Sequence, residues 1–279
     1  MRRAAVLIAL VMLVAPILAA SRARAAPVAL KLTYVTYADG FTTVQLTATV
    51  NLTATGYRLA VDYHTLGTIG FLFPGHDEAV AEGAWQGESA APSGFQSEGL
   101  WGGRKFDVRM AYAGGEPEVL TLEPKESEKR ESVPAALREG TIDTASAMAL
   151  LIERAADGEG CRMAEKVFDG RRLIAFSAEP AGSEQLGVTT RSFFHGPAER
   201  CDVTGKMLAG FLRSDGPAER ARVNRGTVWF AHPIPGLPLL PVRIRFSTKW
   251  FGAATMYLTD IEAAPPTGGL KRVARSPAR

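Results

Sequence analysis

The stretch VQLTATVNLTATGYRLAVDYH, residues 44–64, alternates apolar and polar side chains on both sides of a short break. Valine, leucine, alanine and tyrosine occupy every second position, and mostly polar residues lie between them. The four-residue link Thr53–Gly56 suits a hairpin turn between the two runs. Because period-two alternation gives one buried and one wet face, the stretch predicts two antiparallel strands that cover a core on one side.

The same alternation recurs further along the chain, at residues 105–112 and 242–250. Residues 144–156 instead repeat at helical spacing, and Asp143 is placed to cap the first amides of that helix. A dozen or so short strands are too many for a flat sheet. We therefore expect a mainly β protein, a large antiparallel sheet that curls into a half-open β-barrel around one α-helix.

The inward side chains of such a sheet either fill a core or line a cavity, and the sequence leaves both readings open. We expect the four tryptophans, Trp85, Trp101, Trp229 and Trp250, to pack in the core. The candidate cavity lining consists of alternate apolar strand positions and the apolar stripe of the helix. These residues are Leu46, Val50, Leu59, Val108, Met148, Leu151, Ile152, Val242 and Ile244.

Residues 1–25 have the three-part layout of a secretory signal peptide, with a positive start, an apolar run and a small-x-small site at Ala23–Ala25. The alternative is a retained membrane anchor, but the apolar run is short for a spanning helix and contains Pro16. We expect cleavage near Ala25, export to the periplasm and a single β-rich domain over residues 26–262. Residues 263–279 contain basic side chains and no acid, which indicates a disordered tail or, less often, a contact for an anionic surface.

The charge of the chain depends on its first segment. Four of the 32 Lys and Arg residues lie within residues 1–25, which leaves 28 against 29 Asp and Glu in the remainder. A nearly neutral body gives no electrostatic reason to expect nucleic acid as a partner.

The two cysteines, Cys161 and Cys201, are expected to form one disulfide, because an exported protein with a small, even cysteine count is oxidised in its compartment. A metal site is the weaker alternative, since neither cysteine has a second cysteine or a histidine at ligand spacing.

The sequence VFDGRR, residues 167–172, lies between two strand-like runs. Asp169 and Gly170 form a dipeptide that accepts the positive backbone angles of a tight hairpin, so we interpret them as a structural turn. Arg171 and Arg172 offer the alternative of an anion site, although arginines beside an exposed turn are usually solvated.

Several motifs in this order resemble a bacterial exported family known as domain of unknown function 3108. The likeness runs over residues 56–213 and rests on Trp101-Gly102-Gly103-Arg104, Gly114-Gly115 before Pro117, Val133-Pro134 before Asp143, and Cys161 with VFDGRR and Cys201. The family usually has Asp-Pro-Leu-Ser at the helix start, whereas this chain has Asp143-Thr144-Ala145-Ser146, which keeps the cap but loses the proline. The resemblance implies no activity. It implies a compartment and a shape similar to the curled-sheet periplasmic carriers of lipoproteins.

Catalytic and metal signatures are absent from the sequence: it contains no Gly-x-Ser-x-Gly elbow, no His-Glu-x-x-His and no phosphate-binding Gly-Lys-Ser/Thr loop. The compact cluster His76-Asp77-Glu78 would be an incomplete metal site, and we interpret it as an exposed loop. We therefore expect no enzyme activity, no catalytic residue, no metal site and no cofactor.

Two functions remain open. The first is a periplasmic binding or carrier module for a lipid, an acyl chain or another apolar ligand, which requires a cavity open to solvent. The second is a structural or interaction factor of the cell envelope, in which the barrel is filled and an envelope protein binds its outer surface.

Overall fold

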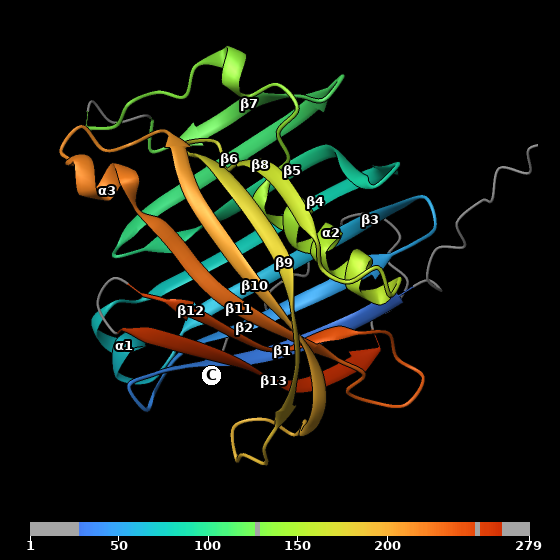
Figure 1. The fold of residues 1–279 in the computed structure, drawn as a ribbon. Coiled ribbons are helices and arrows are strands. Elements are labelled where there is room, and N and C mark those ends of the chain that lie inside the picture. The colour runs from blue at the N-terminus through green and yellow to red at the C-terminus, as the bar shows by residue number, and fades with distance from the viewer. Residues whose placement is uncertain (1–27, 126–128, 249–251, 264–279) are drawn as a thin grey trace, which may run out of the picture.

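The structure, a computed structural model, describes residues 28–125, 129–248 and 252–263. The expected signal peptide at residues 1–25, Trp250, and all but the first residue of the expected tail at 263–279 lie outside these ranges. Within them the chain forms a single large sheet that curls around a helix (Figure 1).

The sheet has thirteen strands in the described residues, and all of its neighbouring strands are antiparallel. The strands are β1 (Val28–Ala38), β2 (Phe41–Leu52), β3 (Gly56–Thr65), β4 (Gly75–Gln86), β5 (Ser89–Trp101), β6 (Arg104–Ala113), β7 (Glu116–Glu123), β8 (Met163–Phe168), β9 (Leu173–Leu186), β10 (Gly196–Ala209), β11 (Val223–Ala231), β12 (Leu240–Ser247) and β13 (Ala253–Ala263). The last strand ends one residue beyond the expected domain end at 262.

The sheet consists of two arms, each with its strands in chain order, and the arms meet where the first strand lies beside the last. Strands β1 to β7 form one meander and β8 to β13 form another, and the arms are joined by the pairing of β1 with β13. That ladder runs from Leu30 opposite Ala263 to Ala38 opposite Ala254. The two edges of the sheet are β7 and β8, so the barrel is half-open.

Alternation of side chains explains why these segments are strands. Along β1 every second residue is buried, from Val28 through Leu32 to Ala38, and the residues between them are half-buried. The opening stretch forms β2 and β3 as the sequence predicts, with Val50 opposite Leu59. Thr53 closes the link between them by donating its amide hydrogen to the carbonyl of Gly56. The buried face of the sheet therefore lies on the concave side.

The main helix, α2 (Thr144–Ala156), has the predicted bounds and packs against β2 to β5, β8 and β12 on the concave side (Figure 1). Its buried residues include Leu151 and Ile152. A 13-residue helix depends on such burial, because isolated helices of that length are marginally stable in water. The sequence indicated one helix, but the structure adds two short ones and a 3₁₀ turn in the connections. These are α1 (Gly67–Leu72), α3 (Pro217–Ala221) and η1 (Ala135–Leu137).

The gap between the edge strands β7 and β8, here called the seam, is spanned without a strand ladder. The free edge of β8 is met by Ile142, which pairs with Val167 in a parallel bridge just before α2 begins. The turn between β8 and β9 reaches across to the other edge, where the guanidinium of Arg171 donates to the carbonyl of Pro124 at 2.6 Å. The VFDGRR segment thus connects the two arms of the sheet.

The turn itself differs in detail from the expected tight hairpin. Phe168 pairs with Leu173, so the loop has four residues, and only Gly170 has a positive φ, of 89°. The carboxylate of Asp169 instead accepts the amide hydrogens of Arg171 and Arg172 at 2.9 and 2.7 Å. These side-chain hydrogen bonds stabilise the four-residue loop, which needs only one residue with a positive φ, whereas a two-residue type I′ turn needs two.

The disulfide between Cys161 and Cys201 is present, with a Cα–Cα distance of 6.2 Å. It ties the segment after α2 to β10, so the helix and the second arm are covalently linked. Among the described residues, no helix is both long and apolar enough to cross a membrane.

Replacing Gly170 by alanine should destabilise the fold more than the same change at Gly40. Both glycines follow an aspartate in a hairpin and have a positive φ, of 89° and 86°, so each change strains the backbone by about 1–2 kcal/mol. A Cβ at Gly170 would lie 2.7 Å from a methyl of Val108, whereas one at Gly40 meets nothing within 4 Å. The overpacking adds about 1–3 kcal/mol at Gly170 alone.

Urea unfolding of the two variants and the unchanged protein measures this difference. Equal loss of stability in both variants would show that the turn at Gly170 is not packed closely against Val108 on β6.

Candidate functional site

A cavity of about 470 Å³, partly open to solvent, lies between the start of α2 and the inner face of β2 to β6. The helix therefore fills only part of the concavity. The apolar wall of the cavity consists of Leu46, Val61, Ala79, Phe95, Val108 and Met148. Its polar rim includes Tyr63, Asp77, Asp169, Arg171 and Arg172.

Strand register explains why these residues gather. Residues directly opposite one another on neighbouring strands point to the same side of a sheet. Leu46 lies opposite Tyr63, and Tyr63 lies opposite Asp77, which forms one row across β2, β3 and β4. The neighbouring row passes through Val61, Ala79, Ser97 and Val108. Most strand residues of the cavity therefore belong to these two adjacent rows of the concave face, and Phe95 adds a contact from the next row.

The structure divides the nine predicted lining residues into two groups. Leu46, Val108 and Met148 line the cavity. The other six lie in the packed core or against it, and they are Val50, Leu59, Leu151, Ile152, Val242 and Ile244. Val50 and Leu59 are fully buried one row further along the sheet, where the buried side of α2 occupies the space.

Several cavity residues were not among the lining residues predicted from the sequence: Tyr63, Asp77, Phe95, Trp101 and Phe106. The interpretation of His76-Asp77-Glu78 as an exposed loop was wrong, because these residues belong to strand β4. Asp77 faces the cavity because it lies opposite Tyr63 on the neighbouring strand. The sequence alone does not give this pairing, so it could not show which of His76 and Asp77 points inward.

The tryptophans also differ from the expectation of core packing. Trp85 and Trp229 are buried, but Trp101 is 54% exposed at the edge of the cavity.

The acidic part of the rim is partly buried and hydrogen-bonded. The hydroxyl of Ser97 donates to Asp77 at 2.8 Å. Burial nevertheless raises the pKa of the Asp77 carboxyl, because the loss of hydration outweighs that bond. Burial and the nearby charge of Asp77 raise the pKa of the Tyr63 hydroxyl to about 12. Tyr63 therefore stays protonated and can donate a hydrogen bond at the cavity mouth.

The basic part of the rim comes from the turn at the seam. Arg172 pairs with the carboxylate of Asp169 at 2.7 Å, and Arg171 reaches Pro124. These contacts hold the turn against β7 and fix one wall of the opening.

A buried polar network fixes the start of α2, which forms the floor of the cavity. Asp143 is fully buried and accepts hydrogen bonds from the Ser146 amide at 2.8 Å and from the Ser146 hydroxyl at 2.6 Å. The hydroxyl of Tyr57 on β3 donates to the Ser146 hydroxyl at 2.6 Å, and its ring packs on Trp85. Burial raises the pKa of Asp143 to about 6, against the hydrogen bonds that lower it.

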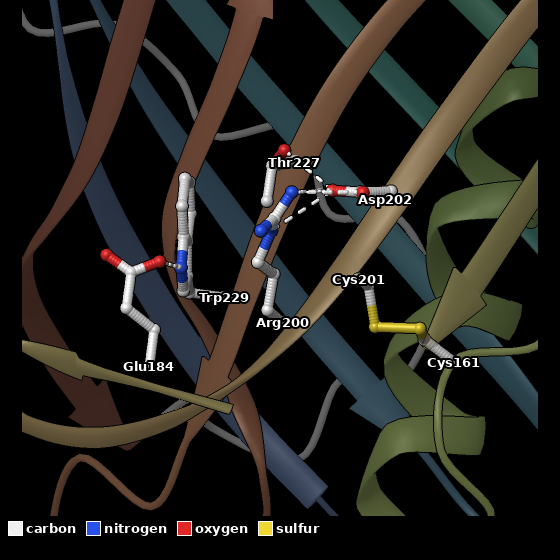
Figure 2. A network of polar contacts seen from close by, with 7 residues as sticks. All are labelled: Cys161, Glu184, Arg200, Cys201, Asp202, Thr227 and Trp229. Atoms are coloured by element: carbon white, nitrogen blue, oxygen red, sulfur yellow. Dashed lines mark hydrogen bonds and ion pairs between the residues drawn. A yellow bond between two sulfur atoms is a disulfide. The ribbon is translucent and has the colours of Figure 1, made fainter. Parts of the chain in front are cut away.

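A second polar network lies on β9, β10 and β11 near the disulfide (Figure 2). Arg200 pairs with Asp202 at 3.0 Å, and Asp202 also accepts from Thr227. The indole of Trp229 donates to Glu184 at 2.8 Å. The Arg200–Asp202 pair is exposed enough to solvent to contribute little to stability, and these side chains are satisfied by one another. We therefore place the candidate site at the cavity.

The fold and this site define a half-open β-barrel with a partly filled apolar interior. Comparison with protein families matches residues 30–259 to the family described as Protein of unknown function (DUF3108), and the chain belongs to that family.

Among solved structures, the chain is similar to one described as a beta-barrel-like protein of domain of unknown function DUF1849 from Brucella abortus. The TM-score is 0.50 at 11% identity, over 87% of this chain and 99% of that one, so the likeness concerns the fold alone. A search of curated proteins finds no match.

Replacing Asp143 by asparagine should change how stability depends on pH. The folded-state pKa of about 6 lies above the ordinary value of 3.8, so the folded protein holds this proton more tightly than the unfolded chain. The stabilisation that comes from this raised pKa is therefore fully present below about pH 4, and it is lost as the pH rises through about 6. Over that window the unfolding free energy of the parent should fall by about 3 kcal/mol relative to the variant.

Urea unfolding at several pH values measures this relative change, and Asp260→Asn, an exposed position on β13, is the matched control. Parallel pH profiles for the parent and Asp143→Asn would contradict the assignment.

Proposed function

We propose that the protein is a non-catalytic binding or carrier module of the cell envelope that holds a lipid acyl chain or another apolar ligand in the cavity beside α2. The observation that carries the proposal is the cavity itself, with an apolar wall, a polar rim and access from solvent. Its volume of about 470 Å³ lies within the range of small-molecule sites.

The distribution of polar groups supports an amphiphilic ligand. Apolar side chains such as Val61, Phe95 and Met148 would contact a hydrocarbon chain, whose transfer from water is favourable at about 25 cal/mol per Å². The Tyr63 hydroxyl and the arginines of the turn lie at the rim, where a polar head would remain hydrated. Asp77 and Arg172 are already engaged with Ser97 and Asp169, which suits holding a ligand more than transforming it.

The periplasm remains the proposed compartment. A disulfide in a protein is typical of an oxidising environment, and the Cys161–Cys201 bond supports export. The alternative function, an envelope interaction factor with a filled barrel, would make the cavity incidental.

Filling the cavity should weaken ligand binding without unfolding the protein. Ala79 lies in the cavity wall, so Ala79→Phe should reduce saturable binding of a hydrophobic fluorescent probe by about tenfold or more. Ala60 is on the neighbouring strand with its side chain on the opposite face, since it alternates with Leu59 and Val61. The control Ala60→Phe should therefore bind the probe like the parent protein.

Native mass spectrometry of protein purified from its own host, followed by organic extraction, would identify a natural ligand. The absence of saturable probe binding by the well-folded parent would exclude the carrier function and favour the interaction factor.

A further inference from the structure

The connection between β3 and β4 exposes three consecutive large apolar residues. Phe71, Leu72 and Phe73 are 85%, 58% and 58% exposed, and none of the residues of α1 is buried. Single exposed apolar side chains are common on soluble proteins, but a contiguous group marks a surface that contacts another molecule.

Two neighbouring segments extend this group. Thr65 holds the end of the α1 loop, because its hydroxyl donates to the carbonyl of Phe73 and accepts the amide hydrogen of Gly75. The ring of Trp101 lies so close to Gly75 that a Cβ there would be 2.7 Å from it. The start of α1 is tied to β2 by the bond from the Leu66 amide to Thr43, two residues after the exposed Phe41. We call Phe41, Phe71, Leu72, Phe73 and Trp101 the apolar rim patch.

The apolar rim patch is continuous with the mouth of the cavity. Trp101 belongs to the patch and also lines the cavity, and its ring meets that of Tyr63 at a centroid distance of 6.4 Å. Figure 1 places α1 at the periphery of the molecule, where a docked surface could reach it. A ligand that leaves the cavity past Trp101 would thus meet the patch before it met bulk water.

Charges beside the patch indicate which partner it fits. Arg104 and Lys105 are exposed at the start of β6, where they lie opposite Trp101 and Leu100 across the turn. Acids are also present: Asp39 lies in the turn before Phe41, and Glu78 and Glu98 line the same surface groove as Lys105. Aromatic side chains next to cations are typical of surfaces that enter the interface of a bilayer with anionic lipid.

We propose that this end of the barrel docks on a membrane surface containing anionic phospholipid, with Phe71, Leu72, Phe73 and Trp101 in the interface and Arg104 and Lys105 against the head groups. The inference rests on the proposed carrier function and deepens it, because it gives the ligand a route between bilayer and cavity that avoids water. A short loop with large exposed side chains suits insertion between lipids better than it suits a flat interface between proteins.

Flotation with lipid vesicles tests the proposal. The full mature chain is mixed with vesicles of phosphatidylcholine alone and with vesicles of phosphatidylcholine and phosphatidylglycerol. We expect binding to the anionic vesicles that weakens as salt is raised. The double variant Phe71→Ser/Leu72→Ser should bind them about tenfold or more weakly, since each change removes a large apolar side chain from the interface.

The control Val188→Ser removes an equally exposed apolar side chain, 83% exposed, beyond the far end of β9, and should bind vesicles like the parent. Arg104→Gln/Lys105→Gln should lose the preference for anionic vesicles. The proposal is overturned if the parent binds neither kind of vesicle, or if the double variant binds as the parent does. A concentration-dependent dimer that the double variant abolishes, without vesicle binding, would assign the patch to a second copy of the chain instead.

The two proposals fail separately. The double variant keeps the cavity wall and should still bind the fluorescent probe in solution, whereas Ala79→Phe keeps the patch and should still float with vesicles. Vesicle binding without probe binding would remove the carrier function alone, and probe binding without vesicle binding would remove membrane docking alone.

Discussion

The pairing of the first strand with the last is the constraint on which the rest of the structure depends. Each arm of the chain could form a meander by itself, but only the ladder between β1 and β13 makes them one sheet. Leu32 and Leu258, on these two strands, are both fully buried, so the junction lies at the centre of the core. A sheet of this width with one apolar face must curl to bury that face, and the curl creates the concavity in which α2 lies.

Competition for the concavity decides where the cavity forms. Val50 and Leu59 belong to the same packed core as the buried residues of α2, while the next rows toward the β3–β4 connection face the cavity beside the start of α2. The network of Asp143, Ser146 and Tyr57 sets this limit, because it fixes where the helix begins. A buried carboxyl with a raised pKa is costly to keep charged, and Asp143 directly precedes Thr144, the first residue of α2 in the cavity lining.

Local patterns predicted the parts of the structure that depend on neighbouring residues. The hairpin of β2 and β3, the helix at 144–156 with its Asp143 cap and the disulfide follow from alternation, spacing and cysteine count. The register between strands could not be derived, and without it Val50 and Leu59 are indistinguishable from Leu46, although only Leu46 faces open space. Without the register, the sequence also could not show that Asp77 lies on a strand facing the cavity, or that Trp101 is exposed. Whether an apolar residue is covered depends on what lies above it, and alternation alone carries no such information.

The seam gives the barrel a property that a closed barrel lacks. In a closed barrel the circumference is set by the number of strands and their stagger, so it cannot change without rupture of a ladder. Here β7 and β8 lie at opposite ends of the strand order, and the contacts across the gap include the packing of Gly170 on Val108, the bond from Arg171 to Pro124, the isolated bridge between Arg130 and Leu212 and the ion pair of Glu131 with Arg220. Expansion of the girth would therefore break the contacts at the seam, at the β8–β9 turn and between residues 129–131 and 211–213, but would leave every ladder between neighbouring strands intact. Under the proposed carrier function, discrimination by ligand size would therefore be weak at the wall, and selectivity would reside in the polar groups of the cavity.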